Sequence, residues 1–196
     1  MSVPPTSRTV RRAYLALGRA TRLPGKFFLP VDGVPIVRRE IDALRSLGLE
    51  TALVSVAPVA LADVPVLNDA RDAGPLGALA TVLDVTREPF YLFGGDMPFL
   101  DPISIASMER RFRGRSVVPN GPTGAPEVLH AIYAGVEAEL VDRSIARGSG
   151  LRHLVDELER EGGVDRIPYG ELNPSTFTDV DTPEDYARVV RRPKAN

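Results

Sequence analysis

The sequence contains no cysteine, which excludes disulfides and thiolate metal sites but leaves open a cation held by oxygen ligands, such as magnesium. It also lacks an excess of charge of either sign, because 24 basic side chains stand against 26 acidic ones and the formal charge is -2. A chain without a strong positive field has no general attraction for nucleic acid or for an anionic membrane. Any anion that the protein binds must therefore be held by a local group of cations.

Long apolar runs are missing as well. No run approaches the roughly 20 residues of a membrane span, and the segment MSVPPTSRTVRR lacks the apolar core of a secretory signal. We therefore expect a cytoplasmic protein with neither nucleic acid nor membrane as a partner. Because 196 residues with 43% hydrophobic content can bury one sizeable core, we expect a single domain at 11–191. It would lie between a disordered N-terminal tail at 1–10 and a C-terminal tail at 192–196.

Strand and helix patterns alternate along the first half of the chain. Apolar runs predict strands at 12–17, 51–57, 64–67 and immediately before Gly94-Gly95. Apolar residues at helical spacing predict one helix between Pro35 and Gly48 and a second that begins at Gly74-Pro75. This alternation implies parallel strands joined by right-handed crossovers. It predicts a single-domain, three-layer α/β/α fold with a Rossmann-like, mostly parallel sheet.

The second half adds further elements. The patterns predict helices at 102–112, 137–147 and 151–158 and strands at 115–119, 128–133 and 177–181. A run of turn residues at 120–124 separates two of these strands and predicts a small antiparallel hairpin over the cleft. A final helix is predicted by Thr182 as N-cap, Pro183 at the first helical position and Asp185 at the capping-box position.

Asp96 directly follows the apolar run that ends in Gly94-Gly95. In open parallel sheets, ligands bind beyond the carboxyl ends of the strands, so Asp96 would stand at the edge of a cleft. The two glycines would leave room beside it for a ligand or a metal ion. A plain turn or N-cap role for this carboxylate remains open.

The loop from Gly18 to Lys26 follows the first strand and carries three cations, Arg19, Arg22 and Lys26. Such a loop suits a triphosphate, because glycine frees backbone amides to face phosphate oxygens, Arg22 can hold two oxygens at once, and Lys26 supplies a compact charge. The spacing matches neither the Walker motif nor the dinucleotide fingerprint. A solvated basic turn is the alternative, and the position after the first strand favours the phosphate interpretation.

Asp96, Asp179 and Asp181 are candidate ligands for magnesium, which prefers hard oxygen donors. In a strand, alternation would place Asp179 and Asp181 on the same side. Asp181 could also belong to the helix entry beside Thr182, and the two roles are compatible.

Other catalytic signatures are absent. His130 lies in a strand-like run, where a structural role is expected, and His153 lies in a helical pattern that favours the surface. No spacing of serine, histidine and aspartate suggests a hydrolase, and no zinc signature occurs.

Five segments form an ordered set: LALGRATRLPGK at 15–26, GPLGAL at 74–79, GGDMPFL at 94–100, PEVLHAIY at 126–133 and FTDVDTPEDY at 177–186. They match, in the same order, the patterns LAGGxSxRMGxDK, GPLAG, CDMPF, P-L-x-A-x-Y and F-x-N-x-NTPED. These are the patterns of the molybdenum cofactor guanylyltransferases, the MobA-like branch of the nucleotidyltransferases, and over nearly its whole length the chain resembles that family. The resemblance implies the nucleotide-diphospho-sugar transferase fold.

The resemblance also assigns roles. It implies that Lys26, Arg22 and Asp96 are catalytic, with Lys26 and Arg22 on the triphosphate and Asp96 on magnesium. The residues that it places around the nucleotide are Leu15, Ala16, Gly18, Lys26, Ser55, Asp69, Gly74, Pro75 and Asp96. Asp179 and Asp181 would lie near the acceptor, with Asp181 as a second metal ligand. The implied cofactor is Mg²⁺, the implied substrate is GTP, and the implied acceptor is a phosphorylated molecule similar to molybdopterin.

The departures from the family pattern fall in the first loop. Leu17 replaces the first glycine of a pair, Ala20 the common serine and Leu23-Pro24 the Met-Gly, and the loop is one residue shorter. Because leucine restricts the approach of the backbone to a ligand, transfer of CMP or use of another small phosphate acceptor remains an alternative. A non-catalytic relative that binds nucleotide or a protein partner is another. Met97, where relatives that transfer CMP usually have glutamine, favours GMP. Transient contact with proteins that deliver or receive the cofactor is a further implied interaction.

Overall fold

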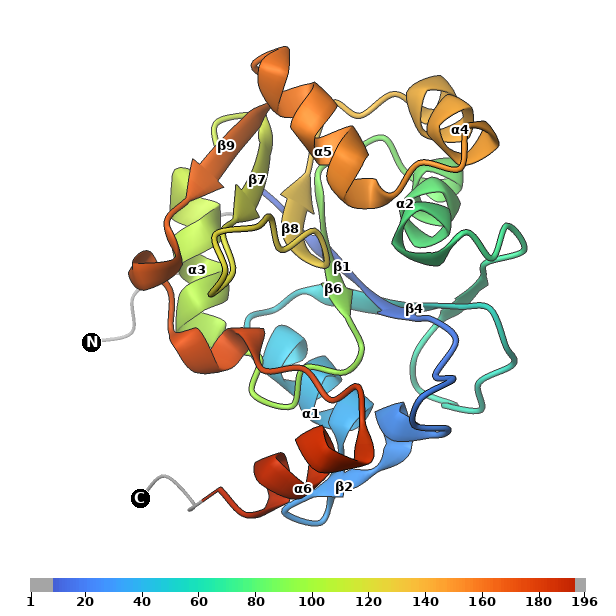
Figure 1. Ribbon diagram of the computed structural model, residues 1–196, viewed down its shortest axis with the longest axis vertical. Coiled ribbons are helices and arrows are strands. Elements are labelled where there is room, and N and C mark those ends of the chain that lie inside the picture. Colours follow the sequence, from blue (N-terminus) through green and yellow to red (C-terminus); the bar gives the residue numbers. More distant parts are fainter. Residues whose placement is uncertain (1–8, 193–196) are drawn as a thin grey trace.

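A seven-stranded sheet lies between two layers of helices in the computed structural model, which describes residues 9–192 (Figure 1). The strands of this sheet are β1 Arg12–Leu17, β4 Glu50–Ser55, β5 Val66–Asn68, β6 Phe90–Gly94, β7 Ser116–Pro119, β8 His130–Tyr133 and β9 Val164–Ile167. The helices are α1 Ile36–Ser46, α2 Gly74–Val85, α3 Pro102–Arg111, α4 Ala138–Ala146, α5 Leu151–Arg160 and α6 Pro183–Val190. Short 3₁₀ turns are η1 Lys26–Phe28, η2 Tyr169–Glu171 and η3 Pro174–Phe177.

The strand order is β5-β4-β1-β6-β8-β7-β9. Strands β5, β4, β1 and β6 pair in parallel, and β7 is parallel to β9, whereas β8 is antiparallel to both β6 and β7. The predicted mostly parallel sheet is therefore confirmed. The predicted antiparallel pairing of β7 with β8 also occurs, but β8 lies inside the main sheet. A separate small hairpin is formed by β2 Pro30–Val31 and β3 Val34–Pro35.

Apolar side chains on the two faces of the sheet form two separate cores. Helices α2, α4 and α5 cover one face, and α1 and α3 cover the other (Figure 1). All five residues of β6 are buried, as expected for a central strand with helices on both sides. Because β1 and β6 are neighbours in the middle of this sheet, the loops that follow them lie at the same edge.

Local sequence signals set most helix ends where we expected them. The side chain of Thr182 accepts a hydrogen bond from the Asp185 backbone, and the Asp185 carboxylate accepts one in return, so the predicted capping box of α6 is present. Gly48 directly follows the last turn of α1. Pro35 is the N-cap of this helix, one position before the first turn that we predicted for it.

The predicted strand at 177–181 is wrong. Residues 178–181 have no regular structure, because their backbone donors bond to a turn, to the Asp96 loop and to a helix cap instead of to a neighbouring strand. Thr178 N donates to Ser175 O, Val180 N to Asp96 O, and Asp181 N to the Asp185 carboxylate of the capping box. Strand β9, which we did not predict, instead pairs with β7 at the edge of the sheet.

The ends of the predicted domain can be compared only in part. Val10 is fully buried, so the packed chain includes at least this residue of the predicted tail at 1–10. The Arg192 guanidinium lies 4.8 Å from the centre of the Phe99 ring. The remainder of both predicted tails, 1–8 and 193–196, lies outside the described residues. Within 9–192, no helix combines the length and the apolar character needed to cross a membrane.

Candidate functional site

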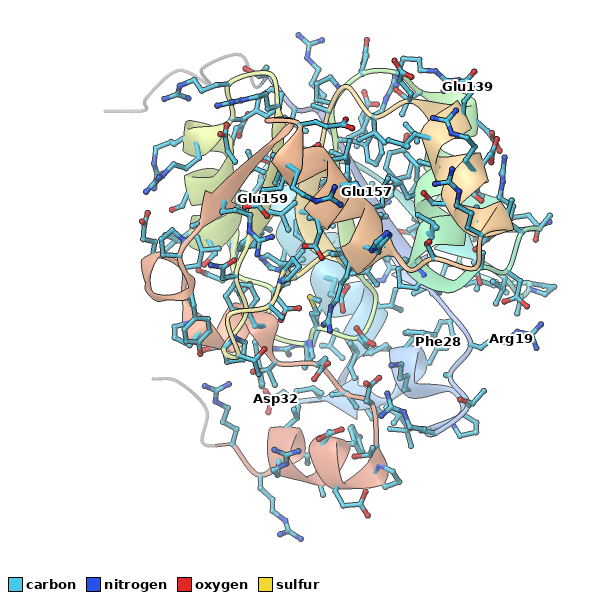
Figure 2. All side chains as sticks on the ribbon, turned by 45° about the horizontal axis from the view of Figure 1, so that its top comes forward. Arg19, Phe28, Asp32, Glu139, Glu157 and Glu159 are labelled. Carbon is cyan, nitrogen blue, oxygen red and sulfur yellow. The ribbon has the colours of Figure 1, made fainter. Side chains whose placement is uncertain are left out.

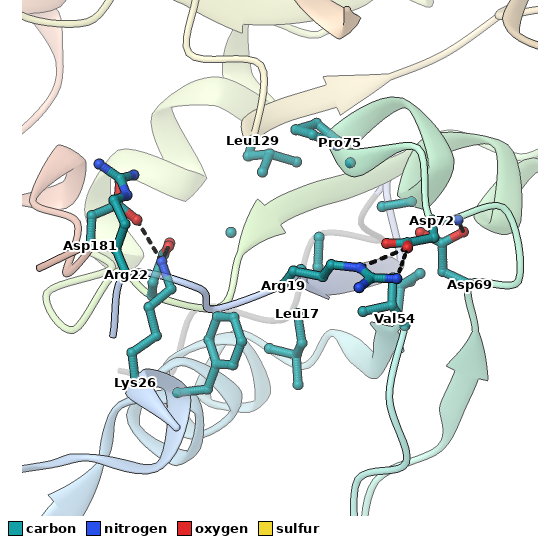
Figure 3. A pocket seen from close by; sticks show the side chains of 18 residues that line it. Leu17, Arg19, Arg22, Lys26, Val54, Asp69, Asp72, Pro75, Leu129 and Asp181 are labelled. Atoms are coloured by element: carbon teal, nitrogen blue, oxygen red, sulfur yellow. Dashed lines mark hydrogen bonds and ion pairs between the residues drawn. The ribbon is translucent and has the colours of Figure 1, made fainter. Parts of the chain in front are cut away.

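A cavity of about 480 Å³ lies at the carboxyl ends of β1, β4 and β6 (Figure 3). It contains the end of β1, the first loop, the start of α2 and two aspartates from the second and last thirds of the chain. The carboxyl edge of a parallel sheet is where open α/β folds bind their ligands. Side chains of opposite charge lie at both ends of this cavity, and apolar groups and backbone lie between them (Figure 3).

Lys26 is the central cation at one end. Gly25 precedes it with a φ of 74°, a left-handed conformation that glycine adopts without strain and that turns the chain into η1. The Lys26 ammonium lies 2.5 Å from an oxygen of Asp96 and 2.6 Å from one of Asp181. Although burial favours the neutral amine, the two carboxylates raise the pKa of Lys26, so its charge is kept inside the cavity.

Arg22 and Asp181 complete this end, which we call the phosphate end, formed by Arg22, Lys26, Asp96 and Asp181. The Arg22 guanidinium pairs with the second oxygen of Asp181, so Asp181 bridges both cations. Asp96 follows β6, as predicted, and its backbone carbonyl accepts the Val180 amide. The structure therefore brings together all of the predicted catalytic residues, although their catalytic role stays a prediction.

The opposite end, which we call the base end, is formed by Arg19, Asp69, Asp72, Gly74 and Pro75. The Arg19 Nε atom donates to Asp72 at 2.7 Å and joins the first loop to the loop before α2 (Figure 3). This ion pair lowers the pKa of Asp72. Asp69 is buried, and one of its oxygens accepts hydrogen bonds from the Arg71 and Asp72 amides and from the hydroxyl of Thr81.

Leu17 packs directly against Gly95. A Cβ atom on Gly95 would lie only 2.1 Å from Leu17 Cδ2, so the leucine occupies the space that a side chain at position 95 would need. In the family pattern described above, position 17 is glycine and position 95 is cysteine. The two departures therefore compensate for each other in volume, and Leu17 extends toward Gly95 while its other atoms line the cavity.

Most of the residues predicted to surround a nucleotide line this cavity. They are Ala16, Gly18, Lys26, Asp69, Gly74, Pro75 and Asp96. Leu15 points away into the core beneath the sheet, so only its backbone could approach a ligand. Ser55 does not line this cavity, because side chains alternate along β4 and Val54 and Val56 take the cavity side. The Ser55 hydroxyl donates to Ala57 O at 2.7 Å, and Ser55 lines a neighbouring cavity. The ligand contacts of Leu15 and Ser55 stay predictions.

Asp179 lies close to the phosphate end but does not line the cavity. Loss of hydration raises its pKa, and the negative charges of Asp96 and Asp181 act in the same direction. Its acceptor role stays a prediction. Two exposed side chains near the cavity, those of Arg19 and Phe28, project from the surface of the molecule (Figure 2).

The donor set at the phosphate end suits magnesium. Among the described residues, no group of three or more histidine, aspartate or glutamate side chains is arranged to hold a metal ion. Asp96 and Asp181 nevertheless converge on one point, which the Lys26 ammonium fills. Magnesium in proteins is usually bound by one or two carboxylates, and its other ligands are water molecules and substrate phosphates. Asp96 and Asp181 are thus the residues that would hold the ion.

Sequence reasoning missed Glu40. This residue lies on the apolar face of α1 and is 0% exposed, and its Oε1 accepts a hydrogen bond of 2.7 Å from the Met97 amide next to Asp96. A signal was available, because Val37, Ile41 and Leu44 define an apolar stripe in which position 40 falls at i+3. A charged residue in such a stripe indicates a buried polar contact.

His153 is exposed, as predicted, whereas His130 is buried but lacks, in the described structure, the hydrogen bonds that we expected of a satisfied structural histidine. His130 is fully buried between the rings of Phe93 and Phe177, and neither of its nitrogens has a hydrogen-bond partner in 9–192. Burial lowers the pKa of His130 to about 3, so the ring is neutral at pH 7. His153 is exposed on α5 and lies 3.4 Å from Glu157.

The chain is similar to known nucleotidyltransferases in sequence and in fold. A family profile described as the MobA-like NTP transferase domain matches residues 13–161. A probable molybdenum cofactor guanylyltransferase of Natronomonas pharaonis is 30% identical, over 91% of this chain and 95% of that protein. Among solved structures, the molybdopterin-guanine dinucleotide biosynthesis protein A of Archaeoglobus fulgidus has a TM-score of 0.70 at 18% identity and covers 91% of this chain and 96% of its own.

A second solved structure, the 2-C-methyl-D-erythritol 4-phosphate cytidylyltransferase of Thermus thermophilus, has a TM-score of 0.68 at 15% identity over 92% of this chain and 98% of its own. At such identities the two solved structures establish only a shared fold. The family profile covers most of the chain, and the similarity to the N. pharaonis protein extends over nearly all of it. The chain therefore belongs to the MobA-like NTP transferase family of nucleotidyltransferases.

Proposed function

We propose that the protein transfers GMP from GTP to the phosphate of molybdopterin and releases pyrophosphate, with Mg²⁺ as cofactor. The observation that carries the proposal is the convergence of Lys26, Asp96 and Asp181 at one end of a cavity whose other end is lined by Gly74 and Pro75. Cations and carboxylates at one end suit a triphosphate with its metal, and small residues at the other suit a planar base. The relative from N. pharaonis carries the name of this activity.

The reaction needs no strong base on the protein, because the acceptor phosphate is already ionised near pH 7. An oxygen of that phosphate forms a bond to the α-phosphorus of GTP, and the bond from the α-phosphorus to the bridging oxygen of pyrophosphate breaks. Catalysis then depends on in-line positioning and on neutralising the charge that moves to the leaving pyrophosphate. These are tasks for fixed cations rather than for a proton acceptor.

Lys26 and Arg22 supply the fixed cations in this proposal. Lys26 is buried and stays charged beside two carboxylates, so its field acts in a site of low dielectric constant. Arg22 is more exposed and can present two parallel donors to the outer phosphates. Bound magnesium, held by Asp96 and Asp181, would add charge neutralisation at the phosphate oxygens.

Asp181 and Asp179 would border the acceptor. Asp181 lies at the N-terminal end of α6, where the capping box fixes the chain immediately after it. The segment 178–181 also contacts the Asp96 loop through Val180. An acceptor that enters beside this segment would place its phosphate next to the phosphate end of the cavity.

Pyrophosphate release tests the proposal. The protein is incubated with magnesium, a molybdopterin preparation and each of GTP, CTP, ATP and UTP, and released pyrophosphate is measured. We expect release with GTP that requires both acceptor and magnesium. If pyrophosphate is released with CTP but not with GTP, the protein transfers CMP instead of GMP. If none of the four nucleotides gives release, a non-catalytic nucleotide-binding role is left.

A further inference from the structure

Glu40 is a fully buried carboxyl group that the proposed transfer does not use. It lies on the inner face of α1, and its Oε2 atom is buried without a hydrogen-bond partner among residues 9–192. Leaving a buried polar atom without a hydrogen bond is unfavourable. Packing alone would be served better by an apolar residue, as at Val37, Ile41 and Leu44 on the same face. The polar side chain at this position therefore indicates a role beyond the core.

The only hydrogen bond that the Glu40 side chain accepts in the described structure comes from the backbone next to Asp96. Three hydrogen bonds hold the backbone between Gly95 and Met97. Gly95 N donates to Ala16 O at 3.1 Å, Val180 N donates to Asp96 O at 3.0 Å, and Met97 N donates to Glu40 Oε1 at 2.7 Å. The bond to Glu40 is the shortest of the three and the one that comes from a side chain. It links the first helix of the fold to the loop after β6.

Burial and the nearby charge of Asp96 favour the neutral form of Glu40. Burial raises the pKa of Glu40 well above the usual range, and the negative charge of Asp96 acts in the same direction, whereas the Met97 amide and Lys26 oppose it. A neutral carboxyl and an amide have the same shape, and both accept a hydrogen bond at the oxygen that faces Met97. Glutamine is therefore a close replacement, and methionine is an apolar side chain of similar length that accepts no comparable bond.

We propose that Glu40 is a positioning residue of the site: through the Met97 amide it fixes the peptide after Asp96, so that the Asp96 carboxylate faces Lys26 and the cation site. Glu40 itself touches neither nucleotide nor acceptor. Its effect on GTP binding rests on the proposed function, but its effect on the Asp96 loop does not. The two effects are measured separately.

Hydrogen exchange of the Met97 amide tests the positioning directly. We compare the wild type with Glu40→Gln, Glu40→Met and a control, Ile41→Val, which removes one methyl group from the same helix face without removing the bond. We expect the Met97 amide to exchange at least about tenfold faster in Glu40→Met than in Ile41→Val. In Glu40→Gln its exchange rate should stay within about twofold of the wild-type rate. Unchanged exchange in Glu40→Met would overturn the proposal.

Thermal unfolding separates positioning from general stability. Replacing a poorly satisfied buried carboxyl by an apolar side chain is often neutral or stabilising, so Glu40→Met is expected to keep or exceed the melting temperature of Ile41→Val. If faster exchange in Glu40→Met is matched by an equal rise across all of β6 and α1, Glu40 only supports the core and the proposal is wrong.

Nucleotide binding gives the functional readout. In the wild type we expect magnesium to tighten GTP binding, measured by titration calorimetry. In Glu40→Met this gain falls by about tenfold, while GTP affinity without magnesium changes by less than about twofold, and Glu40→Gln keeps the gain. Equal loss in Glu40→Gln and Glu40→Met would contradict the role of the Met97 bond. If exchange changes as expected but wild-type GTP binding ignores magnesium, the positioning stands and the proposed function fails.

Discussion

The two ends of the cavity are built in different ways. The phosphate end gathers four charged side chains from three distant segments, and Lys26 within it is only 8% exposed at its side chain. The base end is closed by one exposed ion pair, Arg19 with Asp72, over small residues and backbone. One end is therefore held by charges grouped around the buried Lys26 ammonium, and the other by shape, by the buried Asp69 carboxylate and by an ion pair that water screens.

This difference implies a division of labour. Buried charges interact strongly and cannot be rearranged without a large cost, so changes at the phosphate end should affect transfer most. An exposed ion pair contributes little, typically less than about 1 kcal/mol, so changes at the base end should alter affinity or base preference modestly. The following variants test the comparison from its strongest to its weakest expected effect.

Asp96→Asn is expected to have the largest effect. A neutral amide is a poor ligand for magnesium, so transfer should fall by at least about a hundredfold, while thermal unfolding shows that the fold persists. Pyrophosphate release is the measurement. The matched control is Asp156→Asn, which removes the same charge from the exposed face of α5. Turnover of Asp96→Asn near that of the control would remove Asp96 from the metal site.

Lys26→Met tests whether the buried cation serves the outer phosphates. Loss of a hydrogen bond from a charged donor costs roughly 1.5 to 3 kcal/mol, so GTP affinity should fall about tenfold to a hundredfold, whereas GMP affinity should change much less. Both are measured by titration calorimetry. The variant leaves Asp96 and Asp181 facing each other, so its unfolding curve is recorded as well. Equal losses for GTP and GMP would indicate a structural role for Lys26.

Variants of Leu17 and Gly95 test whether the large side chain at the end of β1 compensates for the missing side chain directly after β6. Gly95→Ala places a methyl group against Leu17 and should destabilise the protein by about 1 to 3 kcal/mol through overpacking. Adding Leu17→Ala removes the clash, so the double variant should be more stable than the sum of the single effects predicts, by at least about 1 kcal/mol. Denaturant unfolding of the four proteins gives the coupling. Additive effects would refute the compensation.

Arg19→Ala is expected to have the smallest effect. Its ion pair with Asp72 is exposed at the cavity mouth, so GTP affinity should change by less than about fivefold and the dependence on salt should weaken. Arg188→Ala, which removes an exposed arginine from α6, serves as the control. A loss as large as that of Lys26→Met would show that the base end also depends on fixed charge.

The sequence predicted those parts of the fold that depend on neighbouring residues. The helical stripe of α1 and the capping box at Thr182 and Asp185 are local signals, and both were confirmed. The insertion of β8 between β6 and β7, and the edge strand β9, depend on pairing between distant segments, which no local pattern encodes. The strand predicted at 177–181 is wrong because aromatic and β-branched residues such as Phe177, Thr178 and Val180 are typical of strands, whereas a turn, the Asp96 loop and a helix cap accept the backbone donors of this segment.

The same distinction holds for the site. Lys26, Arg22, Asp96 and Asp181 were predicted because each follows a recognisable motif, and the fold brings them to one end of the cavity. Glu40 could not be placed from the sequence, because its contact with the Met97 amide joins residues 57 positions apart. Sequence motifs thus pointed to the charged groups but not to the bond that holds one of them.

The division of labour between the two ends is tested most directly by thermal unfolding with magnesium and each nucleotide. A ligand at a hundred times its dissociation constant stabilises the native state by about 2.7 kcal/mol, which is roughly 5 to 10 °C for a domain of this size. We predict that GTP raises the melting temperature more than CTP, ATP or UTP, and that Lys26→Met loses this shift while Arg19→Ala keeps it. A largest shift with CTP, no shift with any nucleotide at millimolar concentration, or equal losses in the two variants would contradict the account.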